Sequence, residues 1–153
     1  MKQVFPLAQA PGGGVHLQPL LPLLVLVPIL LVAWYLMSAP RLVRFEISPQ
    51  GLRIRGDLFY SRTIAASELM LEGARPLDLT ATPEYKPKWR TNGPGLPGYK
   101  AGWFKLQNGQ KALLFVGDSK RVVYIPVRSG YSLLLSVTDA EQFLAALHNA
   151  VAN

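Results

Sequence analysis

The chain has 153 residues, of which 50% are hydrophobic and 16% are charged, and its formal net charge is +7 at pH 7. That length suits one domain, and the composition excludes a collagen-like repeat, an intrinsically disordered chain and a multidomain enzyme. Because the chain has no cysteine, it cannot hold a disulfide framework, a zinc ribbon, an iron–sulfur cluster or a thiol nucleophile.

An apolar segment, Leu17–Met37, follows a tail over residues 1–16 that we expect to be flexible. The segment carries no charge and is long enough to span a hydrocarbon core of about 30 Å as a helix. A cleaved signal peptide or a buried soluble helix are the alternatives. The segment is longer than the apolar region of a signal peptide and lacks the small-residue cleavage pattern. We therefore predict a transmembrane helix over residues 17–38.

Basic residues near this segment indicate its orientation. Only Lys2 precedes it, whereas Arg41 and Arg44 follow it directly. Because positive residues favour the cytoplasmic side, we expect the C-terminal part of the chain to be cytoplasmic. Trp34 and Tyr35 suit the headgroup layer, so we expect these two rings and the two arginines to be the membrane-interface anchors.

Residues 40–153 form the predicted domain, in which strand patterns recur at short spacing. Alternating apolar residues predict antiparallel strands, with hairpin turns at residues 48–51, at Asn108-Gly109 and at residues 128–130. The strands that we predict cover residues 45–48, 52–56, 59–65, 99–106, 111–116, 122–127 and 131–137, with an extended piece at 70–79.

Two other segments complete the domain. Residues 80–98 are rich in Pro and Gly and predict a long irregular loop, which in a compact domain is functional or disordered. At the C-terminus, Thr138 and Glu141 fit a capping box that begins a helix. Its apolar residues fall on one face: Phe143, Leu144, Leu147 and Val151. About seven antiparallel strands closed by this helix predict an α+β, mostly β, barrel-like fold.

Two motifs carry a resemblance to a known family. The first is Arg-x-Asn-Gly-x-Gly-x-x-Gly-Tyr-x-x-Gly over residues 90–102, and the second is a Leu- and Ser-rich strand that runs into a helix over residues 136–147. With them, residues 42–151 resemble bacterial membrane-associated PH-like (pleckstrin-homology-like) domains. The resemblance implies a PH-like barrel over residues 40–153 behind a transmembrane helix of the bacterial inner membrane. It implies no catalytic residue.

A basic and aromatic cluster within residues 86–105 is the candidate ligand- or partner-binding site. Its charges either form a solvated surface or bind an anionic ligand. The candidate contacts are Lys86, Lys88, Trp89, Arg90, Asn92, Tyr99, Lys100 and Trp103.

We expect a non-enzymatic, membrane-anchored module that binds a protein partner at the membrane surface. The alternatives are binding of anionic lipid headgroups, or a role as an accessory subunit of a membrane enzyme or transporter. We do not expect nucleic acid as a partner, because no RNA-binding motif is present. We expect no cofactor and no metal, because His16 and His148 are far apart in sequence and the carboxylates lack metal-ligand spacing.

Overall fold

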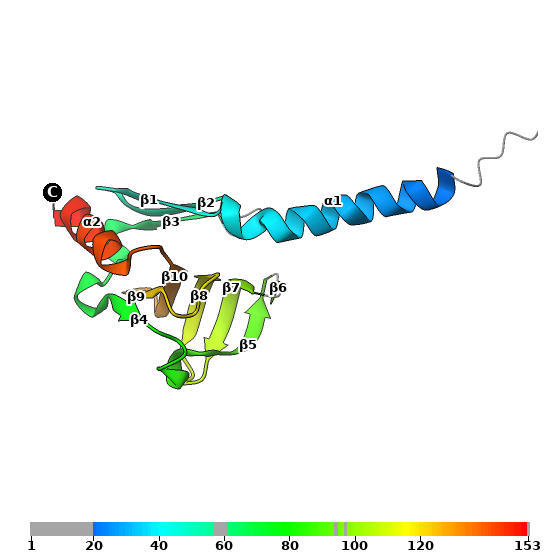
Figure 1. Cartoon of the computed structure of the whole chain (residues 1–153). Helices are drawn as coiled ribbons and strands as arrows, with labels where there is room; N and C mark the ends of the chain where they lie inside the picture. The colour runs from blue at the N-terminus through cyan, green and yellow to red at the C-terminus, as the bar shows by residue number, and fades with distance from the viewer. Residues whose placement is uncertain (1–19, 57–60, 94, 97, 153) are drawn as a thin grey trace, which may run out of the picture. The chain divides into compact units, whose positions relative to one another are not determined.

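The structure of the chain is a computed structural model, which describes residues 20–56, 61–93, 95–96 and 98–152 (Figure 1). Contacts divide the chain into residues 1–35 and residues 36–153. The predicted N-terminal tail lies outside the described residues.

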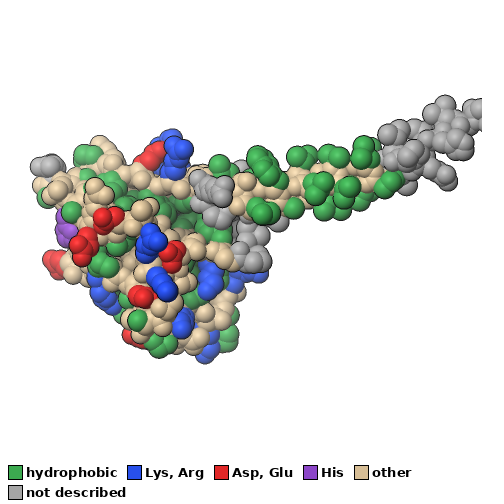
Figure 2. Space-filling model, viewed as in Figure 1, with side chains coloured by type: hydrophobic (Ala, Val, Ile, Leu, Met, Phe, Trp, Pro, Cys, Tyr) green, Lys and Arg blue, Asp and Glu red, His purple; other side chains and the backbone are tan. Residues whose placement is uncertain are grey.

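Helix α1 spans Leu20–Leu42. Its described apolar side chains are exposed, with Leu24 at 76% and Met37 at 80%, and they form the green stretch along α1 in Figure 2. Within the described part of the chain, no helix meets the combined length and hydropathy needed to cross a membrane. The predicted transmembrane helix over residues 17–38 is therefore not supported here, and residues 17–19 of it lie outside the described residues.

A small antiparallel sheet opens the domain, in the order β1-β2-β3. Its apolar face points inward, with Leu52 and Ile54 fully buried and Ile64 4% exposed. Gly51 pairs with Ala65 at a φ of +140°, and a Cβ there would lie 2.0 Å from the carbonyl oxygen of Ile64. Only glycine allows this approach of β2 to β3. The strands are β1 (Arg44–Ser48), β2 (Gly51–Arg55) and β3 (Arg62–Ala65).

A larger sheet of seven strands has the order β4-β9-β10-β8-β7-β5, with β6 paired to β7. The strands are β4 (Arg75–Leu77), β5 (Pro87–Asn92), β6 (Gly95–Leu96), β7 (Tyr99–Leu106), β8 (Lys111–Val116), β9 (Val122–Val127) and β10 (Tyr131–Ser136). Short 3-10 turns lie at Ala66–Glu68, Leu71–Gly73 and Pro83–Tyr85.

Strand β10 lies between β8 and β9 and runs parallel to β8. Strands β8 and β9 are consecutive in the chain but not adjacent in the sheet, because β10 occupies the position between them. The Ser136 hydroxyl at the end of β10 holds this connection, because it donates to the Asp118 carbonyl at 2.8 Å and accepts from the Asp118 N–H at 3.1 Å.

The prediction of a mostly β domain with a C-terminal helix is confirmed, but the predicted barrel of about seven antiparallel strands is wrong. The described residues form ten strands in two separate sheets with one parallel pair, and these sheets do not close into a barrel. The sequence pattern could not reveal the separation, because alternation of apolar residues predicts strands and not which strands pair.

The predicted irregular loop over residues 80–98 is also wrong in part, because it contains β5 and β6. Pro87 is the first residue of β5, and β5 is the edge strand of the large sheet. Proline is tolerated at the first residue of a strand and on an edge strand, because no neighbouring strand needs a hydrogen bond from its missing N–H. The predicted extended piece over residues 70–79 contains a 3-10 turn before β4.

Alternation along the large sheet gives the domain two apolar clusters. The interior cluster lies between the large sheet, the small sheet and helix α2, and contains Leu113, Phe115 and Leu133. The outer cluster covers the opposite face, where residues 77–85 fold over Leu114 and its neighbours.

Helix α2 (Ala140–Ala152) contacts β1 and β2 of the small sheet and β4 and β9 of the large sheet. The predicted apolar stripe is confirmed, since Leu147 is fully buried and the other three residues pack against the interior cluster. The predicted cap is one residue too early. The Gln142 N–H donates to the Asp139 carboxylate at 2.9 Å, which makes Asp139 the N-cap in place of Thr138.

Candidate functional site

The large sheet separates the predicted basic cluster into two faces. Trp89 lies opposite Lys105 across β5 and β7, and Lys105 shares a face with Trp103 and the interior cluster. Arg90 lies opposite Phe104, which belongs to the outer cluster. The predicted residues therefore do not form one continuous site, although Lys88, Trp89 and Arg90 are all exposed on β5.

On the outer face, Lys86 and Lys100 line the same pocket, whose volume is about 210 Å³. Its other lining residues are Leu79, Thr80, Pro87, Gln107 and Ser119. Both lysines are exposed, and Gln107 is held nearby because its N–H donates to the Lys86 carbonyl at 2.9 Å. The pocket is a shallow basic surface beside the outer cluster.

On the inner face, Trp103 is the centre of a group of rings and cations. Its ring meets the Tyr131 ring edge-on, at 4.9 Å between centroids. The Lys111 ammonium lies 4.5 Å from the Trp103 centroid, and the Arg62 guanidinium lies 5.4 Å from it and 5.8 Å from the Tyr131 centroid. We call Arg62, Trp103, Lys111 and Tyr131 the cation–aromatic cluster.

The environment of Tyr131 reflects both burial and charge. Burial raises the pKa of its phenol above the ordinary value, the positive charge of Arg62 opposes this rise, and the negative charge of Glu68 adds to it. The Glu68 carboxylate accepts a hydrogen bond from the Ser129 hydroxyl.

The remaining predicted contacts lie in different settings. Tyr99 is 4% exposed within the interior cluster. Asn92 is exposed on β5, opposite Trp103.

The predicted membrane-interface anchors are also spread out. Trp34 is 69% exposed and Tyr35 is half-buried, both on α1. The side chain of Arg41 lies outside the described residues. Arg44 begins β1 opposite Arg55, whose guanidinium pairs with Glu46 at 3.4 Å.

The positive charge of the domain is concentrated in one segment. Residues 85–117 contain six Lys and Arg and no Asp or Glu, whereas residues 40–153 contain 15 basic and nine acidic residues in all. The excess of six positive charges therefore equals the charge of this segment, and the rest of the domain is balanced. In Figure 2, acidic side chains gather on the side where Figure 1 draws α2, β4 and β9, away from β5 and β7.

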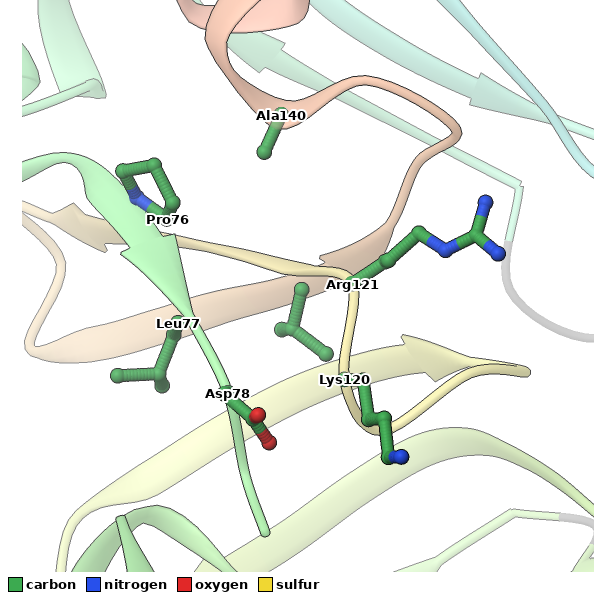
Figure 3. A pocket seen from close by; sticks show the side chains of 7 residues that line it. Pro76, Leu77, Asp78, Lys120, Arg121 and Ala140 are labelled. Atoms are coloured by element: carbon green, nitrogen blue, oxygen red, sulfur yellow. The ribbon is translucent and has the colours of Figure 1, made fainter. Parts of the chain in front are cut away.

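A second pocket, of about 250 Å³, lies between β4, the start of β9 and the start of α2 (Figure 3). Of the charged residues that line this pocket, Asp78 and Lys120 lie near each other (Figure 3). The Arg121 side chain points away from them and pairs with Asp118 at 3.2 Å. The Thr80 hydroxyl and N–H donate to the Asp78 carboxylate at 2.5 and 2.7 Å, and these bonds lower its pKa. A carboxylate held in this way stabilises a turn and is a poor general base.

Three residues of the inner face were not predicted from the sequence: Arg62, Lys111 and Tyr131. The Asn108-Gly109 turn between β7 and β8 could have indicated Lys111, because a tight hairpin fixes Lys105 opposite Lys111. No sequence signal links Arg62 to Trp103, since their contact depends on how the two sheets pack.

The sequence matches a known family. The sequence profile of the bacterial PH domain matches residues 43–151, which is more than two thirds of the chain, and the chain therefore belongs to this family. No curated protein and no solved structure matches the chain. A PH domain is generally a binding or scaffold module and is typically not catalytic.

Catalytic and metal chemistry find little support within the described residues. No group of three or more His, Cys, Asp or Glu side chains there could hold a metal ion. His148 is exposed on α2, and His16 lies outside the described residues. The described site contains aromatic rings together with Lys and Arg cations, and the cations can bind anionic groups.

Proposed function

We propose that this bacterial PH domain protein is a membrane-anchored, non-catalytic module that binds a protein partner at the cytoplasmic surface of the inner membrane. The observation that carries the proposal is the concentration of charge. One acid-free segment supplies the full charge excess of the domain and forms the edge of its large sheet through β5. An excess of positive charge of this kind attracts acidic partners to the β5 and β7 side of the large sheet.

The composition of this surface suits a protein interface. Trp89 and Trp103 of this surface, and Arg62 of β3, which lies against Trp103, are of the residue types that dominate binding energy in protein interfaces. Trp89 is 56% exposed on the edge strand. The surface therefore combines an aromatic contact with positive charge that no salt bridge of the described residues neutralises.

The membrane anchor rests on the sequence. The uncharged segment within residues 17–38 would be expensive to leave in water, since each large apolar side chain favours burial by about 1.5–3 kcal/mol. The described large apolar side chains of α1 are exposed. Anchoring would raise the effective concentration of the domain for other membrane proteins.

Binding of anionic lipid headgroups is the rival function, because Lys88 and Trp89 are exposed side by side. A protein that already has a membrane anchor gains little further localisation from lipid binding. Lipid binding is therefore the second candidate, and a role as an accessory subunit would be one form of the protein-partner function.

The test is crosslinking of the full-length protein in its native membrane, followed by mass spectrometry. We expect one defined membrane protein to be recovered, and we expect carbonate washing to leave the chain in the membrane fraction. Protease treatment of spheroplasts should leave residues 40–153 intact, because they would lie inside the cell.

A triple substitution, Lys86→Ala with Lys88→Ala and Arg90→Ala, separates the two candidate functions. Recovery of the partner at an undiminished level, together with loss of binding to phosphatidylglycerol vesicles, would reverse their ranking. The matched control is Arg53→Ala, Arg55→Ala and Lys120→Ala, which removes the same charge outside the acid-free segment. Release of the chain by carbonate would contradict the anchor.

A further inference from the structure

Four side chains from four strands form a row across one face of the large sheet. Trp89 lies opposite Lys105, and Lys105 lies opposite Lys111. In the parallel pair of β10 with β8, Ser132 lies opposite Ala112, which places Tyr131 beside Lys111. Three strand spacings separate the first side chain of this row from the last, about 14 Å. We call Trp89, Lys105, Lys111 and Tyr131 the cross-strand row.

No salt bridge of the described residues neutralises the cations of this row. Like charges directly opposite each other in a sheet are destabilising, and Lys105 and Lys111 are such a pair. Arg62 adds a third cation from the other sheet, within 5.4 Å of the same Trp103 ring that Lys111 contacts. The ion pairs of the described residues join Arg55 to Glu46 and Arg121 to Asp118, and they involve none of these three cations.

The Trp103 and Tyr131 rings are held in place and are only partly accessible. Trp103 and Tyr131 are half-buried and packed edge-on against each other. Arg62 and Lys111 both lie against the Trp103 ring. A base could not stack on a ring that cations cover, and half-buried rings cannot enter a bilayer interface. The accessible binding groups are therefore the cations and the exposed Trp89 ring.

We propose that the cross-strand row, together with Arg62, binds an extended acidic segment of a protein. This inference rests on the proposed binding function and names the chemistry of its partner. Carboxylates would bind the Arg62 fork and the two lysines by charge-assisted hydrogen bonds. At about 3.3 Å per residue, a segment of four or five residues would cover the row.

The edge of β5 is a poorer place for such a segment to bind. Its register shifts between Pro87 and Trp89 and again between Arg90 and Asn92. Bulges, a proline and basic side chains on an edge strand are the features that prevent the addition of another strand. The acidic segment would therefore lie across the strands, over the row, and would not extend the sheet.

The test uses full-length protein in detergent micelles and fluorescein-labelled hexaglutamate, followed by fluorescence anisotropy at low salt. Two double variants remove equal charge: Lys105→Gln with Lys111→Gln, and Lys86→Gln with Lys88→Gln. Loss of one charge-assisted contact weakens binding about tenfold. The affinity for hexaglutamate should therefore fall at least about tenfold in the Lys105 and Lys111 variant, and less than about threefold in the Lys86 and Lys88 variant. Diglutamate, which is too short to span the row, should bind at least about tenfold more weakly than hexaglutamate.

The same measurements include the results that overturn the inference. Equal losses in the two double variants would mean that the whole basic surface attracts the probe without a defined site. Tighter binding of phosphatidylglycerol vesicles or of oligothymidylate than of hexaglutamate would assign the row to lipid or to nucleic acid. Arg62→Lys keeps the charge but removes the fork, and should weaken binding by about threefold to tenfold.

Failure of this inference can be told from failure of the proposed function. If crosslinking recovers a protein partner while the Lys105 and Lys111 double variant recovers it equally well, the binding function stands and the row is not its site. If no partner is recovered from native membranes at all, the proposed function itself fails.

Discussion

The two ends of the interior cluster are built from different chemistry, although β8 and β10 run through both. At one end Phe45 lies between Phe115 and Phe143, at 6.4 and 6.2 Å between ring centroids, and α2 covers them. At the other end the same strands begin with Lys111 and Tyr131, and cations lie against the rings.

The difference shows which end serves stability and which is suited to binding. Apolar burial under α2 contributes free energy of folding and leaves no group for a ligand. A cation near a ring contributes less, about 0.5–1 kcal/mol at exposed sites, and leaves hydrogen-bond donors accessible. Substitutions at the helix end should therefore change stability, and substitutions at the cation end should change binding.

The largest expected effect is at the helix end. Leu147→Ala removes a fully buried side chain of α2 and should lower the free energy of unfolding by about 2–5 kcal/mol. Chemical denaturation followed by circular dichroism measures the loss. His148→Ala, at the neighbouring exposed position, is the control and should stay within about 0.5 kcal/mol of the wild type. Equal stability of the two variants would show that α2 is not part of the core.

A smaller effect is expected from the cap of the same helix. Asp139→Ala should destabilise the domain by about 0.5–2 kcal/mol, because the Gln142 N–H loses its acceptor. Thr138→Ala is matched in position and should have little effect, although the sequence pattern predicted Thr138 as the cap. Greater loss from Thr138→Ala in the same denaturation experiment would contradict the observed start of α2.

At the cation end, one substitution should stabilise the fold and weaken binding. Lys105→Glu replaces a like-charge pair with an opposite-charge pair, which should raise the free energy of unfolding by about 0.2–1 kcal/mol. Lys100→Glu changes net charge equally, but Lys100 lies opposite Val116 and should gain less. Thermal unfolding at low salt compares them, and destabilisation by Lys105→Glu would show that the lysine pair has a structural role.

The smallest effect concerns the titration of Tyr131. Its raised pKa means that the folded domain holds the phenol proton more tightly than the unfolded chain does. Stability is therefore unaffected at neutral pH and falls as the pH rises above about 10, the ordinary value for tyrosine. Titration followed by ultraviolet absorbance measures the pKa of Tyr131, and the Tyr131→Phe variant assigns the signal. The pKa should rise further in Arg62→Gln, which removes the opposing charge, and should not change in Arg53→Gln. A fall in Arg62→Gln would mean that Arg62 does not act on Tyr131.

Local patterns predicted much of the fold. The Asn108-Gly109 turn gave the β7–β8 hairpin, and apolar spacing gave the buried stripe of α2. The pattern failed where pairing is not local. Pro87 and the glycines near it are typical of a loop, so the edge strand β5 was not predicted. The position of β10 between β8 and β9 could not be predicted from the sequence either.

The candidate site was predicted in part for the same reason. Trp89 and Trp103 lie in one basic segment and were found by composition, but alternation along β7 puts Lys100 and Lys105 on opposite faces. Arg62 comes from the other sheet and contacts Trp103 only because the two sheets pack together. A site built from both sheets cannot be assembled from one stretch of sequence.

Hydrogen–deuterium exchange of the full-length chain in its membrane, with and without the crosslinked partner, tests most directly which end of the domain binds. The account predicts slower exchange over residues 87–92 and 103–111 and at Arg62 in the complex, with α2 unchanged. Slower exchange confined to α2 and β1 would place the partner at the helix end and would contradict it.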